Sequence, residues 1–345
     1  MLKRLTSREQ FELLVSQWEP VIRKAFLDAI ADIKSNVVMK RIVERMERGD
    51  VAGAIEAMDL DATAFRTLDK AIAETFEGGG IASTSNMPTL RDPEGHAFTV
   101  RFDVRNIVAE NWIRDHSLRL VTNIIADQRN SIRQALEAGL ERGMNPRTTA
   151  LDVVGRIDRA TGRRTGGVLG LTAQQELFSQ KALGELLSGD EALLRHYLTR
   201  ERRDKRFDRT VSKAIRDRKP IPAETVQRMI GRYRDNLLKL RGDTIARTET
   251  MAALGQSNIE AYRQAIADGK VSASVVFKIW HSTPDGRTRH THRAMNKQKV
   301  SFDGKFQSRP GVFLAYPCDP DAPVEETVNC RCWMQIKIDH LAGIE

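Results

Sequence analysis

Residue types that bind metals or act as nucleophiles are concentrated near the end of this 345-residue chain. The segment from His281 to Cys332 holds all three cysteines of the chain and three of its seven histidines. Thiolate and imidazole groups are preferred zinc ligands, and a thiol beside an imidazole is also the arrangement of a cysteine nucleophile. The segment therefore points to metal binding or to catalysis, and the surrounding residues have to distinguish the two.

A structural zinc ion usually has four ligands, and the best tetrahedral set here combines one histidine with three cysteines. These residues are His292, Cys318, Cys330 and Cys332. Other interpretations stay open: no cofactor, with buried free thiols beside polar loop histidines, or a disulfide that involves Cys318. A Cys–His nucleophile is a further alternative, but the sequence identifies no third group that would orient the histidine.

A Pro-Asp-Gly turn begins the segment, and its charged residues favour turn chemistry and salt bridges that clamp a hairpin. The enzymatic alternative is a nuclease or transferase site built from Arg287, Arg289, His290 and His292. We expect a structural cassette without a catalytic residue. Its members are Trp280, Asp285, Arg287, Arg289, Asn329 and Arg331, together with Arg247 and Glu249 upstream.

The positive charge of the chain is concentrated in residues 195–219. This segment contains eleven Lys/Arg and four Asp/Glu, a net charge of +7, whereas the whole chain carries +9. One interpretation is a solvated face laced with ion pairs, and the other is a surface for phosphates or an acidic partner. The expected DNA- or partner-binding residues are Arg195, Arg200, Arg202, Arg203, Lys205, Arg206 and Arg209.

The elements around these residues are mostly helical. Apolar residues recur at helical spacing from Phe11 to Ile30, after a predicted capping box that starts at Ser7, and again from Val104 to Leu136. A short strand is expected at 98–102, and two separate helices are expected at 225–240 and from 244 to about 268. Beyond Gly269, β-branched and aromatic runs between turn residues indicate short strands. The fold class is therefore α+β: a predominantly α-helical body with a small C-terminal β-rich α+β domain.

Composition shifts suggest four segments. We predict an N-terminal helical segment at 1–77, a Gly/Ser/Pro-rich linker at 78–97, a helical domain at 98–269 and the α+β domain at 270–345. We expect no signal peptide and no membrane-spanning helix, because no apolar run is long enough. Three cysteines leave at least one thiol unpaired within the chain, which is typical of a reducing compartment such as a cytoplasm.

The order of the C-terminal motifs resembles the phage Mu protein F-like minor head proteins, also called head morphogenesis proteins. The resemblance covers roughly residues 160–335, including the Arg-Thr-Glu helix start at Arg247. Many members of that family carry glycine at two positions where this chain has Lys297 and Cys318. The motifs are Trp280, Asp285-x-Arg287-x-Arg289-x-x-His292, Pro317-x-Asp319-Pro320 and Glu326-x-x-Asn329-Cys330-Arg331-Cys332.

The resemblance implies a non-enzymatic assembly role in the virion. Such a protein binds the portal, contacts the major capsid protein or scaffold, and lines the capsid interior after assembly in the host cytoplasm. Contact with packaged double-stranded DNA is a further expectation, and a membrane partner is not expected. A nucleic-acid-binding regulator unrelated to phage lacks support, because no helix-turn-helix or zinc-finger spacing is present.

Overall fold

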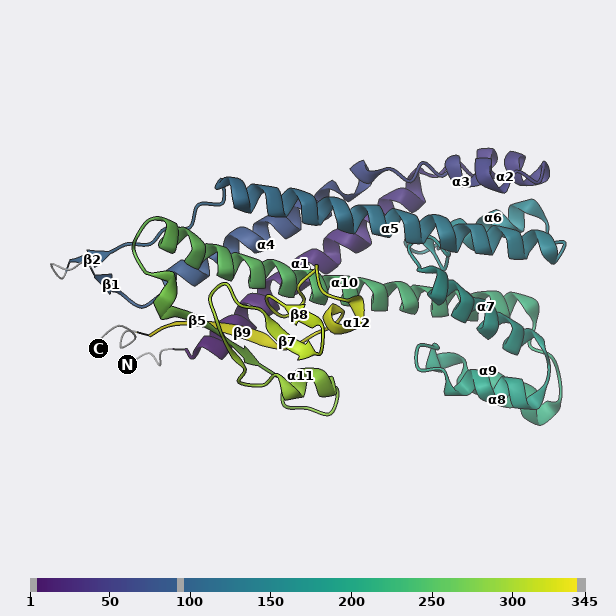
Figure 1. Cartoon of the computed structure of the whole chain (residues 1–345). Helices are drawn as coiled ribbons and strands as arrows, with labels where there is room; N and C mark the ends of the chain where they lie inside the picture. The colour runs from purple at the N-terminus through teal and green to yellow at the C-terminus, as the bar shows by residue number, and fades with distance from the viewer. Residues whose placement is uncertain (1–4, 92–95, 340–345) are drawn as a thin grey trace. The chain divides into compact units, whose positions relative to one another are not determined.

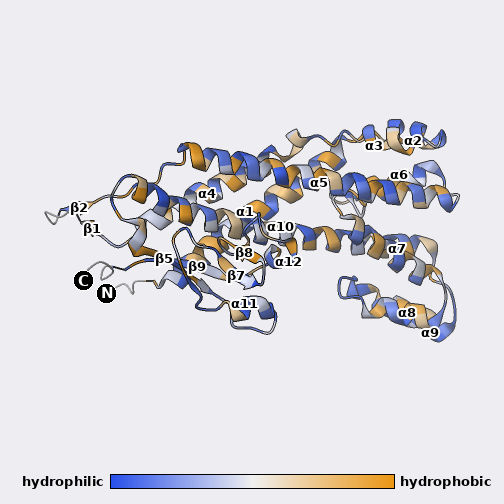
Figure 2. Cartoon of the chain, in the orientation of Figure 1, coloured by the Kyte–Doolittle hydropathy of each residue, from blue (hydrophilic) through white to orange (hydrophobic). Residues whose placement is uncertain are grey.

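The computed structural model describes residues 5–91 and 96–339 and is mainly helical, with short strands near the C-terminus (Figure 1). This confirms the fold class expected from the sequence. None of the helices in the described ranges is long and apolar enough to cross a membrane. Hydrophilic residues recur between hydrophobic ones along the long helices, as expected of amphipathic elements (Figure 2).

The helices are α1 (Ser7–Asn36), α2 (Met39–Glu47), α3 (Val51–Glu56), α4 (Arg66–Ser85), α5 (Ile107–Glu141), α6 (Pro146–Val154), α7 (Ala173–Leu187), α8 (Glu191–Thr199), α9 (Asp208–Asp217), α10 (Ala223–Ala267), α11 (His290–Ala294) and α12 (Val324–Thr327). The strands are β1 (Leu90–Arg91), β2 (Ala97–Phe98), β3 (Arg156–Ile157), β4 (Arg164–Thr165), β5 (Val276–His281), β6 (Lys299–Ser301), β7 (Phe306–Arg309), β8 (Val312–Leu314) and β9 (Trp333–Ile338).

Two compact units are formed from discontinuous parts of the chain. Unit 1 comprises Met1–Ala25, Leu68–Arg119 and Asp243–Glu345, and unit 2 comprises Phe26–Thr67 and Leu120–Gly242. Helices α1, α5 and α10 each contribute residues to both units. The four segments predicted from composition remain a division of the sequence, whereas the units follow tertiary contacts.

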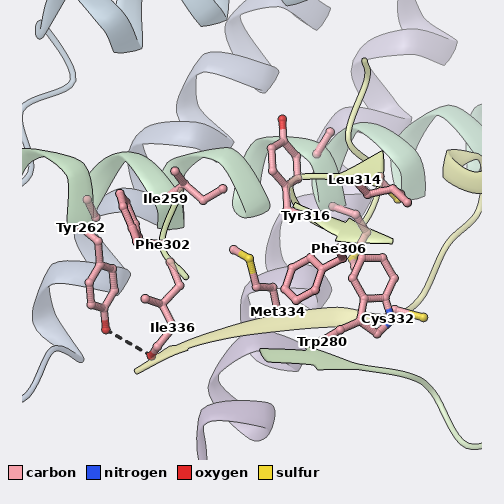
Figure 3. Close-up of a cluster of buried hydrophobic side chains, with 14 of the residues drawn as sticks. Ile259, Tyr262, Trp280, Phe302, Phe306, Leu314, Tyr316, Cys332, Met334 and Ile336 are labelled. Atoms are coloured by element: carbon pink, nitrogen blue, oxygen red, sulfur yellow. Dashed lines mark hydrogen bonds between the residues drawn. The ribbon is translucent and has the colours of Figure 1, made fainter. Parts of the chain in front are cut away.

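Unit 1 contains the strands that surround the cysteines. An antiparallel sheet has the order β6-β5-β9, and β7 pairs with β8 in a separate hairpin. Side chains of the second half of α10 pack on this sheet, and the Tyr262 hydroxyl donates to the Ile336 carbonyl (3.4 Å; Figure 3). Trp280 and Phe306 are fully buried in the same core. The sheet is therefore a small platform against which α10 packs, and Phe11 of α1 also stacks on Trp333 of β9.

Unit 2 has its own apolar core among α7, α8, α9 and the first part of α10. Leu194 and Tyr197 of α8, Val211 of α9 and Val226 of α10 are buried there. Helix α7 begins with a capping box in which Thr172 and Gln175 bond each other's backbone. This core fixes the position of the basic segment 195–219.

Three local predictions were wrong. The N-terminal capping box uses Thr6 and Glu9, one residue before the expected Ser7, because the Glu9 carboxylate accepts from the Thr6 amide at 2.7 Å. The strand expected at 98–102 ends at Phe98. The two helices expected on either side of residue 242 form one continuous helix, α10. Gly242 packs closely against Leu27 there, and a Cβ on this glycine would lie 3.2 Å from the Leu27 side chain.

The predicted linker at 78–97 begins later than expected, because α4 continues to Ser85. Glycine disfavours helix by about 1 kcal/mol relative to alanine, so the composition misleads there. A Cβ on Gly78 would lie 2.7 Å from Trp18, and one on Gly80 would lie 2.3 Å from Phe102. The glycines thus permit close packing of α4, and that packing offsets their low helix propensity.

Candidate metal centre and surrounding cassette

Three separate elements bring the predicted ligands together. His292 lies in α11, Cys318 follows β8, and Cys330 and Cys332 lie in the segment that leads into β9. Each of the four side chains is at most 2% exposed. Residues up to 40 positions apart in the sequence thus converge in one buried cluster.

The imidazole and two of the thiols form a tight group. The His292 Nδ1 atom lies 3.3 Å from the Cys330 Sγ atom and 3.6 Å from the Cys332 Sγ atom. These three donor atoms all lie within 4.8 Å of one another. The Cys318 thiol lies outside this group, contacts the Cys330 thiol and donates to the Thr327 carbonyl at 3.1 Å.

None of the three cysteines forms a disulfide, so the interpretation in which Cys318 is cross-linked is wrong. Cys318 adopts a left-handed backbone conformation with φ +64°, and Lys297 does so with φ +68°. These are the two positions at which glycine is common in the resembled family, and glycine is the residue that this conformation favours. The chain therefore holds a cysteine where the backbone disfavours a side chain.

The other ring nitrogen of His292 faces a carboxylate. The Nε2 atom lies 2.9 Å from Glu326 Oε2, a charge contact without hydrogen-bond geometry. Glu326 is 3% exposed, and it also accepts from the Thr291 hydroxyl at 3.1 Å. Glu326 belongs to one of the C-terminal motifs but was not among the predicted site residues. Its position three residues before Asn329 is the feature of the sequence that could have identified it.

A thiol, an imidazole and a carboxylate in series are also the parts of a nucleophilic triad. The pKa of Cys330 is raised by hydrogen bonding to Cys318, and the pKa of Cys332 is raised by hydrogen bonding to Cys330 and by burial. Activated nucleophiles have the opposite shift and are partly exposed. The arrangement has the properties of structural thiols.

Asp285 and Arg331 form the main clamp of the cassette. The Arg331 guanidinium contacts both Asp285 carboxylate oxygens, one of them at 2.7 Å, and holds the pKa of that carboxyl well below its usual range. Asp285 also accepts from the Arg287 amide at 3.0 Å, as in an Asx turn. The Arg287 side chain itself is 84% exposed.

Further bonds fasten the same turn to the cysteine segment. Arg289 donates to the Val328 carbonyl at 2.6 Å, and the Thr283 hydroxyl donates to the Arg331 carbonyl at 2.6 Å. The indole of Trp280 packs edge-on against the His292 ring, with centroids 5.2 Å apart. The turn, the imidazole and the cysteine segment are therefore held as one assembly.

The upstream Arg-Thr-Glu triplet sends its side chains to three partners within unit 1. Arg247 bonds Glu19 of α1 at 2.5 Å, and Glu249 bonds His116 of α5 at 2.5 Å. Between them, the Thr248 hydroxyl accepts from the Asn329 amide at 3.1 Å. Asn329 has φ +56°, and its turn directs the following cysteines inward. Glu19 and His116 lay outside the predicted site residues, because nothing in the sequence pairs residues so far apart.

The expected binding residues of the basic segment separate into two kinds. Arg200 donates two bonds of 2.6 Å to the buried Glu185, and Arg203 donates two bonds of 2.9 Å to Asp208, so both cations are engaged within unit 2. Arg195 and Arg206 are exposed but paired locally. Arg202, Lys205 and Arg209 are exposed.

Comparison with known proteins identifies one family. Residues 209–335 match the family model described as Phage Mu protein F like protein. No curated protein and no solved structure gives a significant match. The matched segment contains every residue of the cassette from Arg247 to Cys332, which confirms the resemblance drawn from the motifs. Residues 209–335 of this chain are therefore similar to Phage Mu protein F like protein.

Proposed function

We propose that this protein is a phage minor head protein, a virion assembly factor that associates with the portal and the capsid interior. The observation that carries the proposal is the family match over residues 209–335. The role is non-enzymatic. In support, Asp285, Arg289 and Arg331 are engaged in holding the turn and the cysteine segment together, and His292 is 1% exposed.

The partner surface is the solvent face of α9. Arg209, Lys213 and Arg216 are exposed and follow one another at intervals of four and three residues, which places them on one side of the helix. Val211 and Ala214 on the other side are buried in unit 2. Arg209 and Lys213 have no ion-pair partner among the described residues, so their charge is free to meet carboxylates of a portal. We call these three cations the α9 face.

Co-purification of the full chain with the portal protein of the same phage tests the proposal. The wild-type chain is expected to form a complex that imaging locates on the portal. The triple variant Arg209→Gln, Lys213→Gln, Arg216→Gln is expected to fold normally and to lose most of that binding. A chain that never associates with portal or procapsid, or a variant that binds as well as wild type, would contradict the assignment of this surface.

A further inference from the structure

We propose that His292, Cys318, Cys330 and Cys332 bind one zinc ion in a closed structural site and that Glu326 fixes the histidine from behind. This goes beyond the assembly role, since it concerns what holds the C-terminal region together. The proposal rests on the convergence of four buried donor groups, and it would hold for any function of the surrounding surface.

The distances within the three-donor group already suit a tetrahedral ion. Zinc–sulfur bonds of about 2.3 Å and zinc–nitrogen bonds of about 2.0 Å place a sulfur and a nitrogen ligand about 3.5 Å apart. The His292 Nδ1 atom lies 3.3 Å from the Cys330 sulfur and 3.6 Å from the Cys332 sulfur. No backbone rearrangement is needed for these three residues to share one ion.

Cys318 supplies the fourth ligand. Its thiol contacts that of Cys330 and donates to the Cys330 carbonyl at 3.8 Å, so the sulfur borders the three-donor group. Its loop is held in place by Asp319, whose carboxylate accepts from the amides of Ala315 at 2.8 Å and Asp321 at 3.0 Å. A side chain at φ +64° costs about 1 kcal/mol or more relative to glycine. A bond to a metal offsets that cost, whereas an isolated thiol does not.

Glu326 completes the site from outside the ligand group. A metal-bound histidine characteristically directs its second nitrogen at a carboxylate, which fixes the ring orientation and keeps the proton on that nitrogen. The Nε2–Oε2 separation of 2.9 Å between His292 and Glu326 has this arrangement. The buried Nε2 atom has no other hydrogen-bond partner in the described structure, so this carboxylate is the group that faces it.

Soft thiolates with one imidazole in tetrahedral geometry select zinc over the hard cations magnesium and calcium. All four groups are at most 2% exposed, which leaves no open position for substrate and makes the site structural. Bound zinc would join α11, the loop after β8 and the segment before β9. These elements are short, and metal binding is a common way to stabilise such pieces.

Elemental analysis of the full chain, purified without chelator from medium supplemented with zinc, tests the proposal directly. One zinc per chain is expected. Cobalt substitution should give the visible bands of tetrahedral cobalt with an intense thiolate charge-transfer absorption. Zinc content near zero, both after purification and after refolding with zinc, would overturn the proposal whatever the variants show.

Two variants assign the ligands. Cys318→Gly removes one thiol and relieves the left-handed backbone, so loss of zinc without loss of apo-protein stability is expected, and retention of full zinc affinity would remove Cys318 from the set. Cys330→Ser combined with Cys332→Ser should abolish binding, and zinc that persists there would mark surface binding only. His281→Gln is the matched control, because that ring stacks on Trp333 at 4.3 Å and lies outside the donor group.

Discussion

Single buried charges make the most direct predictions about this chain. Lys278 of β5 is 2% exposed, and burial lowers the pKa of its ammonium group from 10.5 to about 8. Its Nζ atom donates to the Ala315 carbonyl at 3.3 Å. The negative charges of Asp303 and Asp319 raise the pKa again, but they offset only part of the effect of burial. Because the folded state binds this proton more weakly than the unfolded state, the free energy of unfolding should rise as pH rises from about 8 to 10.5.

The variant Lys278→Met should remove that rise. A pKa shift of this size lowers the free energy of unfolding of the wild type by at most about 3 kcal/mol. The full penalty applies below pH 8 and disappears above pH 10.5. At pH 7 the variant is therefore expected to be more stable than the wild type. The gain is reduced by about 1 kcal/mol, because the Ala315 carbonyl loses its hydrogen bond from Lys278. Urea unfolding at several pH values measures this, with the exposed Lys181→Met as control. Equal pH slopes in wild type and variant would refute the explanation.

Residue types and spacing predicted His292 and the three cysteines as zinc ligands, and the structure brings His292, Cys330 and Cys332 together, but the sequence could not show what surrounds them. His292 and the cysteines stand out by composition, whereas Glu326, Lys278 and His116 look like ordinary charged residues. Their meaning comes from burial and from partners distant in the chain, such as Glu249 for His116. Likewise, seven arginines and lysines of the basic segment looked equivalent in the sequence, and only the fold shows that Arg200 and Arg203 are held by carboxylates within unit 2.

At the scale of elements, helical glycines have opposite roles that the sequence cannot distinguish. Gly79 of α4 and Gly184 of α7 both lie inside helices. A Cβ on Gly79 would lie 2.3 Å from the Ser257 hydroxyl and 2.8 Å from Leu254, whereas one on Gly184 meets nothing within 4 Å. Helix propensity favours alanine at both positions, so packing decides the sign of the effect.

We expect Gly184→Ala to stabilise the protein by about 0.5–1 kcal/mol, since it adds helix propensity without contact. Gly79→Ala should destabilise it by about 1–3 kcal/mol, because α4 must move away from α10 within unit 1. Chemical unfolding of the two variants in parallel makes the comparison. If both changes stabilise the chain, Ser257 and Leu254 yield freely and the close packing of α4 is not a constraint.

Element types were more predictable than element boundaries. The strands near Trp280, Phe313 and Met334 were expected from their β-branched and aromatic residues, and they form. By contrast, glycine runs and Gly242 suggested interruptions that tertiary packing removes from α4 and α10. Local composition predicts an element well where its own residues decide the outcome. It fails where a neighbouring helix or ring occupies the space that a missing side chain leaves.

For the whole molecule, the question is whether partner binding follows the net charge of +9 or the α9 face in particular. Both explanations predict weaker binding to a polyanion as salt rises. They differ when the same charge is removed elsewhere. Lys40, Lys70 and Arg114 are at least 68% exposed and lie outside residues 195–219, so their replacement by Gln lowers the net charge equally.

Binding of each triple variant to portal and to double-stranded DNA, measured over a range of salt, separates the two explanations. Loss of the α9 face should weaken portal binding strongly, while the matched variant should bind nearly as wild type. If DNA is the partner, each lost phosphate contact should lower the slope of log K against log salt by about 0.9, so removal of the face lowers it by up to about 3. Equal losses in the two triple variants would show that net charge alone attracts the partner, and the α9 face would then have no special role.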